Sequence, residues 1–204
     1  MKSSRLEAFS DGVLAILITI MVLEMKVPKG ASLYDLGEVY TIFLSYILSF
    51  LYLGIYWNNH HHLFQATKYV NGKVLWANLH LLFWLSLIPF TSGWIGRTSF
   101  SAVPQALYGI VLLMSAIAYF ILQYLILKIH GESSILYKAI GNDYKGKISL
   151  ILYACAIPLS FVSQWLSILI YFGVALIWIV PDKRIEKTFY KEIRKKQKEE
   201  DENK

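Results

Sequence analysis

The sequence predicts an all-α membrane protein with six transmembrane helices. Of its 204 residues, 56% are hydrophobic and only 17% are charged, whereas soluble domains average about 25% charged residues. The mean hydropathy is +0.46, and the apolar residues fall in long blocks of the kind that cross a bilayer, which takes about 20 residues of helix. Composition therefore excludes a disordered chain, a fibrous repeat and an ordinary soluble enzyme.

Six apolar blocks are candidate spans. They run from Leu6 to Met25, from Leu36 through Trp57 and past the histidines that follow, from Val74 to Trp94, from Val103 to Leu127, from Ile148 to about Phe161, and from Gln164 to Val180. The fifth block contains Pro158, so its helix is expected to be short, to be kinked at the proline, or to begin before Ile148. With the sixth block it predicts a tight hairpin that turns near Ser160–Ser163.

The distribution of basic residues predicts the orientation. Six spans place only Lys26, Lys29 and Arg97, of 20 Lys and Arg residues, on the side away from the termini. Because Lys and Arg gather in cytoplasmic loops, both termini are expected in the cytoplasm and the chain in the cell membrane. Residues 1–181 are expected to form the transmembrane domain, and residues 182–204 a charged cytoplasmic tail that is helical in part. The net charge of +6 fits contact with anionic membrane lipid, and no nucleic-acid partner is expected.

Motifs of the common enzyme classes do not occur in the sequence. It contains no G-x-S-x-G string, no H-E-x-x-H string and no pair of intramembrane aspartates. The single cysteine, Cys155, excludes a thiolate metal cluster within one chain. We therefore expect neither enzymatic activity nor a cofactor.

Three consecutive histidines, His60, His61 and His62, follow the second apolar block. Successive residues of a helix point about 100° apart, whereas two metal ligands on one helix need i, i+3 or i, i+4 spacing. The run therefore favours hydrogen bonding to the first helix over metal binding, and no metal site is expected.

The first apolar block carries charges, which are costly inside a membrane and mark functional positions. Asp11 lies about 9 Å further along the helix than Arg5 and roughly 120° around it, so the two side chains do not face each other. Each is expected to bind a partner on a neighbouring helix. Glu7 and Asp11 share a face at i, i+4 spacing and repel when both are ionised, which predicts a hydrogen-bond donor nearby.

Beyond Asp11 the first helix is apolar on nearly all sides. Ile16, Ile20 and Leu23 lie on one face, and Thr19 lies beside them. On periodicity alone such a stripe is typical of ordinary helix packing.

Three motifs mark the first half of the chain. Arg5, Phe9, Ser10 and Asp11 form an R-x-x-x-F-S-D element; Tyr56–Phe64 closes the second block with its histidines; and Asn78 is followed by Leu87–Phe90 in the third. Together these motifs resemble the transmembrane protein 175 family, the lysosomal potassium channels and their prokaryotic relatives. A single R-x-x-x-F-S-D copy is similar to the prokaryotic branch, because the animal proteins carry two.

The resemblance implies a homotetrameric channel in which four copies of the first helix line a central pore. By position, Ile16 would form the narrowest apolar ring, Ile20 and Leu23 would continue the wall, and Thr19 would supply a layer of hydroxyls. The partners implied are the chain itself, membrane lipid and permeating potassium ions.

The resemblance also implies a buried network that ties the pore helix to the second and third helices. On the first helix it would contain Arg5, Phe9, Ser10 and Asp11. Its partners would be Trp57, His60, His61 and Asn78.

An apolar ring offers no ligands to an ion, and the sequence has no TVGYG-type string for a carbonyl filter. Such a ring must act through its diameter and its wetting. Potassium sheds its hydration shell more readily than sodium. We therefore predict a cation channel with a moderate preference for potassium over sodium and a hydrophobic gate at the ring.

Two alternatives stay open at this point. A proton-coupled secondary transporter could use the buried Asp11 with the His60–His62 cluster, and a purely structural membrane subunit is not excluded. Transporters of this kind usually show internal repeats and helices broken near the midplane. The second half of this chain has no counterpart of the R-x-x-x-F-S-D element.

Overall fold

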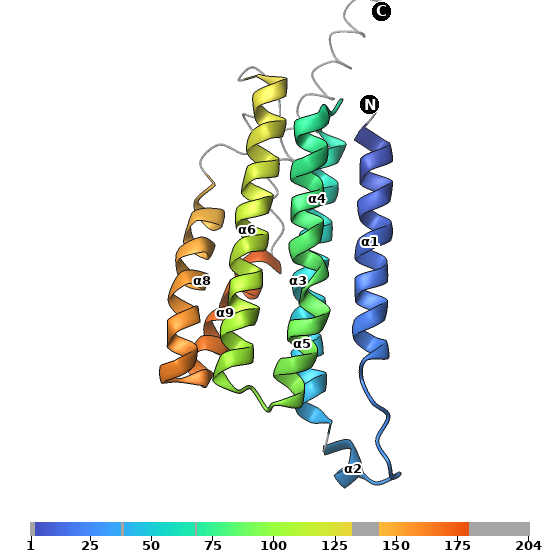
Figure 1. The fold of residues 1–204 in the computed structure, drawn as a ribbon, viewed down its shortest axis with the longest axis vertical. Coiled ribbons are helices and arrows are strands. Elements are labelled where there is room, and N and C mark those ends of the chain that lie inside the picture. The colour runs from blue at the N-terminus through green and yellow to red at the C-terminus, as the bar shows by residue number, and fades with distance from the viewer. Residues whose placement is uncertain (1–2, 38, 68, 132–142, 180–204) are drawn as a thin grey trace, which may run out of the picture.

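The computed structural model describes residues 3–37, 39–67, 69–131 and 143–179, and these residues form a bundle of long helices (Figure 1). The helices are α1 (Ser3–Leu23), α2 (Leu33–Gly37), α3 (Tyr40–Gln65), α4 (Gly72–Ser86), α5 (Ile88–Arg97), α6 (Ala102–His130), α8 (Tyr144–Val162) and α9 (Gln164–Ile179). The predicted tail, residues 182–204, and Val180 lie outside the described residues.

Five helical spans are long and apolar enough to cross a membrane, and α4 and α5 together make one of them. The remaining apolar helix, α9, is described over the 16 residues Gln164–Ile179, and the described residues end with it. The all-helical membrane fold is confirmed for the described part of the chain.

The fifth apolar helix is longer than its hydropathy suggested because its first turn is polar. The helix α8 has 19 residues and begins at Tyr144, four residues before Ile148. Asp143 caps it, accepting a hydrogen bond from the Gly146 backbone N–H at 3.0 Å. The expectation of an earlier start is confirmed, and Pro158 lies inside the helix.

Two further boundaries differ from the predicted blocks. The second long helix begins at Tyr40, because the short helix α2 forms a separate turn that ends at Gly37. The third span is interrupted at Leu87, between α4 and α5. Pro89 follows this break, and since proline has no backbone N–H it cannot continue the hydrogen-bond pattern of α4.

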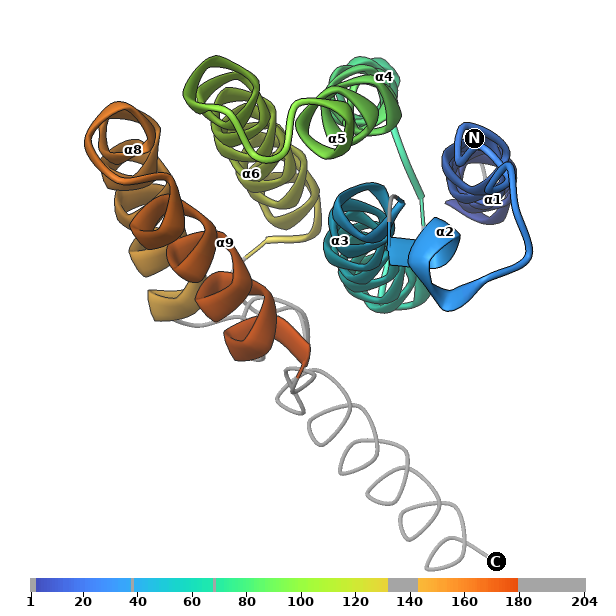
Figure 2. The same ribbon diagram turned by 90° about the horizontal axis from the view of Figure 1, so that it is seen from below.

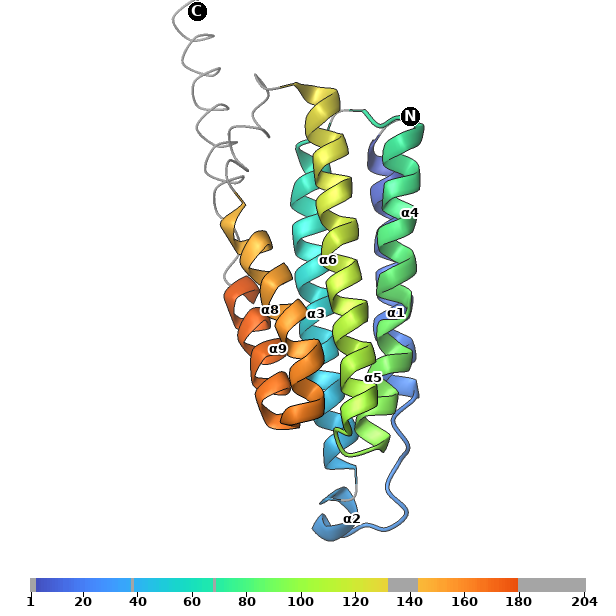
Figure 3. The ribbon, with the colours of Figure 1, turned by 60° about the vertical axis from the view of Figure 1, so that its left-hand side comes forward.

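The helix α1 lies at one flank of the bundle, and α8 and α9 lie toward the opposite flank (Figure 2). The helix α1 packs against α3, α4 and α5. The beginnings of α1 and α4 and the end of α6 lie at one end of the bundle, and α2 lies at the other (Figure 3). We call these the Ser3 end and the Arg97 end.

Tyrosines hold the half of the bundle that faces away from α1. The rings of Tyr52, Tyr108 and Tyr171 come from α3, α6 and α9 and pack edge to face, with centroid separations of 6.4 and 5.7 Å. The Tyr108 hydroxyl lies 3.1 Å from the Ser49 hydroxyl, and the Tyr171 hydroxyl donates to the Gln105 carbonyl at 3.2 Å. Buried polar groups with partners rigidify a core, so α3 offers α1 a firm surface.

Candidate pore helix and its anchoring network

The two faces of α1 have different surroundings. Its buried residues recur every three or four positions: Leu6, Ser10, Leu14, Leu17 and Met21. This spacing places them on one side of an α-helix, and this is the side that packs against α3, α4 and α5. The serine is the one polar member of the stripe, so it needs a hydrogen-bond partner there.

The opposite face of α1 is uncovered and apolar. Ile16 is 59% exposed, Ile20 is 42% exposed and Leu23 is 76% exposed. Thr19 is exposed beside them, and its hydroxyl donates to the Ala15 carbonyl at 2.9 Å. The predicted constriction residues thus do not point into the interior of their own subunit, and their face is free to meet another copy of the chain.

A buried hydrogen-bond chain joins α1, α4 and α3. The Asn78 amide donates through Nδ2 to the Ser10 hydroxyl at 2.9 Å. The Asn78 carbonyl oxygen, Oδ1, accepts a hydrogen bond from His60 Nε2 at 2.8 Å. All three side chains are at most 1% exposed. Such a chain fixes the distance between three helices because each break would leave a buried polar atom unpaired.

A second set of contacts lies nearer the Ser3 end and holds both carboxylates of α1. The Trp57 indole donates through Nε1 to Asp11 Oδ1 at 3.0 Å, and His61 Nδ1 lies 2.8 Å from Glu7 Oε1. His61 Nε2 lies 2.8 Å from the Gln65 amide nitrogen. A carboxylate only accepts and an amide nitrogen only donates, so these contacts fit a neutral imidazole that carries its proton on Nδ1.

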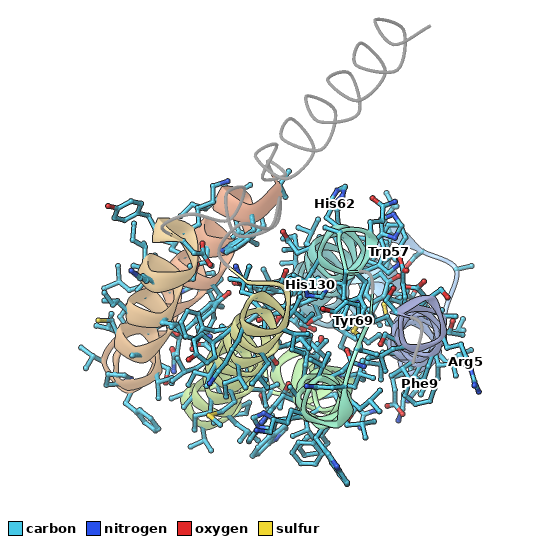
Figure 4. The ribbon with its side chains drawn as sticks, turned by 90° about the horizontal axis from the view of Figure 1, so that it is seen from above. Arg5, Phe9, Trp57, His62, Tyr69 and His130 are labelled. Carbon is cyan, nitrogen blue, oxygen red and sulfur yellow. The ribbon has the colours of Figure 1, made fainter. Side chains whose placement is uncertain are left out.

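Arg5 and Phe9 lie outside this network, which corrects what the motif led us to expect. Both are exposed, Phe9 to 52%, and Figure 4 shows them on the side of α1 that faces away from Trp57. Within the described residues Arg5 makes no hydrogen bond or ion pair. The reason is helical spacing: residues 5, 9 and 16 follow one another at steps of four and seven, so Arg5 and Phe9 share the uncovered face with Ile16.

Neither His62 nor His80 completes a metal site. His80 Nε2 accepts a hydrogen bond from Trp84 of its own helix at 2.9 Å, and the His62 ring packs beside that of His61. In the part of the chain that the structure describes, no three His, Cys, Asp or Glu side chains gather in an arrangement that could hold a metal ion.

The Arg97 end contains an ion pair that the sequence did not predict. Arg97 Nη2 lies 2.6 Å from Glu24 Oε2, and both side chains are about half exposed, at 52% and 53%. Glu24 directly follows α1, and Arg97 is the last residue of α5. Six spans place both residues on the side away from the termini, and this shared position is the signal that could have suggested the pair.

A groove lies between α1 and α5, next to this ion pair. Its lining residues come from both sides: Leu17, Ile20, Glu24, Ser86, Pro89, Phe90, Gly93, Trp94 and Arg97. Phe90 is 62% exposed and Trp94 is 37% exposed. The groove continues the uncovered face of α1, so the two together form one apolar surface.

Known proteins are similar to this chain in sequence. A family model described as the endosomal/lysosomal potassium channel TMEM175 matches residues 5–89. A protein of Chryseobacterium sp. named as a potassium channel is 58% identical over 188 residues, which is 92% of this chain and 98% of that protein. One of Streptomyces collinus with the same name is 35% identical over 126 residues, covering 58% of this chain and 61% of its own length.

The fold is also similar to a solved structure. The crystal structure of a lysosomal potassium-selective channel TMEM175 homolog from Chamaesiphon minutus matches with a TM-score of 0.77 at 28% identity. The match covers 88% of this chain and 97% of that chain. Similarity therefore extends beyond the motif-bearing first half of the chain.

Proposed function

Because the chain belongs to the endosomal/lysosomal potassium channel TMEM175 family, we propose that it is the pore subunit of a potassium channel in which several copies of α1 surround a shared axis. The family consists of ion channels and not of enzymes. The chain is embedded in a membrane through its apolar helices.

The observation that carries the proposal is the division of α1 into an anchored face and an open face. Ser10 and Asp11 are held by side chains of α3 and α4, whereas Ile16 and Leu23 are exposed. A pore helix needs this division, because one face must be fixed while the other meets the permeating ion. Carried over from the resemblance, Ile16 forms the narrowest ring, Ile20 and Leu23 extend it, and Thr19 adds hydroxyls.

Several copies are needed to close such a pore. Within the described residues, a single chain leaves both the face of α1 and the groove beside Phe90 and Trp94 open. Cyclic symmetry lets each subunit supply one helix to the axis and a neighbour cover the remaining apolar surface. Four subunits is the number that the resemblance to the prokaryotic branch implies.

Orientation follows from the basic residues. With both termini in the cytoplasm of a prokaryotic cell, the Ser3 end of α1, with Glu7 and Asp11, lies at the inner mouth of the pore. Leu23 and Glu24 then lie at the outer mouth. Apolar constrictions pass ions when they are wide enough to be wet and block them when they dry. Because potassium sheds its hydration shell more readily than sodium, the pore prefers potassium moderately. The only species that it needs besides lipid is the permeating ion, and it needs no cofactor.

The transporter alternative is not favoured. The relatives are named as channels, and the solved structure is that of a potassium-selective channel homolog. In addition, Asp11 is hydrogen bonded to Trp57 and His60 to Asn78, so these groups serve to hold helices together.

Potassium and sodium fluxes from liposomes that contain purified Ile16→Asn protein test the proposal. We expect the asparagine ring to stay wet, to raise sodium flux and to weaken the preference for potassium. Ile151→Asn is the matched control, because Ile151 lies on α8 and is 64% exposed, against 59% for Ile16. Equal ion selectivity in both variants and the wild type would refute Ile16 as the constriction. Proton-driven substrate uptake would favour the proton-coupled transporter instead.

A further inference from the structure

The ion pair between Glu24 and Arg97 lies where the pore helix meets the outer solution. The Glu24 backbone N–H still donates to the Ile20 carbonyl at 3.0 Å, so Glu24 continues the last turn of α1. Leu23, its neighbour, belongs to the open face and is 76% exposed. Between described residues, this is the one ion pair that joins an arginine or lysine to a carboxylate.

The pair also fixes the direction of the Glu24 side chain. One residue step rotates a helix by about 100°, so Glu24 points sideways from Leu23 and toward α5, where Arg97 ends the helix. The second groove at this end is lined by Met21 and Glu24 on one side and by Gly93 and Arg97 on the other. The carboxylate is therefore held against Arg97, to one side of the face that carries the constriction.

We propose that Arg97 is a specificity-determining residue of the outer pore, which neutralises the ring of Glu24 carboxylates and keeps it from capturing divalent cations. This inference rests on the proposed function, since only copies of α1 around one axis bring several Glu24 side chains to one mouth. A ring of unpaired carboxylates concentrates cations at a pore entrance and offers the oxygen ligands that Ca²⁺ prefers. With Arg97 in place, each Glu24 carboxylate at the pore mouth is paired with a positive charge, so the ring does not attract cations in this way.

Exposure of the pair decides how its effect should depend on salt. Both side chains are about half exposed, so their field reaches the solution and is screened over about 10 Å at 0.1 M ionic strength. The effect of removing one partner should therefore be large in dilute salt and small in concentrated salt. A change in the constriction itself would not follow ionic strength in this way.

Planar-bilayer recordings of potassium current, with Ca²⁺ added to each side in turn, test the inference. We expect Arg97→Gln to raise the current in 10 mM KCl by roughly two- to tenfold, to lose this gain in 1 M KCl, and to become sensitive to Ca²⁺ on one side. Glu24→Gln leaves Arg97 unpaired and should lower the current in dilute salt. The double variant should lose both the gain and the Ca²⁺ sensitivity.

Lys29→Gln is the matched control, because it removes one positive charge from the same side of the membrane without touching the pair. If Arg97→Gln behaves as Lys29→Gln does, or if the double variant stays as sensitive to Ca²⁺ as Arg97→Gln, the inference is wrong. Should Arg97→Gln not fold, Glu24→Gln alone decides, because an unchanged current in dilute salt would overturn the inference. A wild-type protein that conducts no potassium would instead overturn the proposed function.

Discussion

The Trp57 indole donates a hydrogen bond to the Asp11 carboxylate at 3.0 Å, across the boundary between α3 and α1. The same tryptophan ring is stacked on His61, with 6.0 Å between ring centroids and 17° between planes, and His61 contacts Glu7. Both acidic side chains near the start of α1 thus depend on one face of α3.

Trp57→Phe should destabilise the protein by about 1 kcal/mol, because it keeps an aromatic ring beside His61 but leaves Asp11 without its donor. The loss would be measured as a decrease in the midpoint of thermal unfolding in detergent, with size-exclusion chromatography as the readout. Trp165→Phe serves as the control, since Trp165 is 73% exposed on α9. Equal midpoints for the two variants would show that the indole bond contributes nothing.

Asn78→Ala should cost more, about 1–3 kcal/mol, because Asn78 is fully buried and its loss leaves His60 without a hydrogen-bond partner, while Ser10 keeps only its bond to the Leu6 carbonyl. Ser10→Ala removes one bond of the chain and should cost less. The double variant should be hardly less stable than Asn78→Ala alone, since the two side chains contact each other and their effects are not additive. Asn58→Ala on α3 is the control for loss of an asparagine. Additive effects of Asn78→Ala and Ser10→Ala would contradict the buried hydrogen-bond chain.

Gly109→Ala should destabilise the half of the bundle that supports α3. A methyl group at Gly109 would lie 2.1 Å from the Tyr171 hydroxyl oxygen, whereas one at Gly173 would meet nothing within 4 Å. We expect a loss of about 1–3 kcal/mol from overpacking at Gly109 and none at Gly173, where alanine favours the helix. Adding Tyr171→Phe to Gly109→Ala should recover part of the loss, and failure to recover any would place the strain elsewhere.

Sequence patterns identified the helices because these depend on spacing within one segment, but periodicity alone favoured ordinary helix packing for the face of α1 that the structure leaves uncovered. Ile16, Ile20 and Leu23 fall on one face by arithmetic alone, whereas the partners of α1 depend on how it crosses other helices. Ser10 and Asn78 are 68 residues apart, so their bond could be inferred only through the family motif. The same motif placed Arg5 in the network, whereas Arg5 is exposed in the single chain, because a motif lists residues without saying which face of the helix each one occupies.

Helix lengths at the far flank were harder to predict, for a local reason. The first turn of α8 contains Lys145 and Lys147, which lower the hydropathy of a segment that is helical from Tyr144 onward. Asp143 gives a capping signal, but hydropathy alone does not register it. Likewise, Glu24 and Arg97 could be assigned to one side of the membrane from the sequence, while their contact depends on how α1 packs against α5.

Cadmium inhibition of potassium flux through Ile16→Cys protein, with the exposed Cys155 replaced by serine, tests the central claim most directly. Several thiolates around one axis form a site for a soft metal ion, so micromolar Cd²⁺ should block the flux, and removing it with a chelator should restore the flux. Ile151→Cys in the same background should be insensitive. Flux through the Ile16→Cys protein that Cd²⁺ leaves unchanged would contradict the account, because Ile16 would then face lipid and another helix would line the pore.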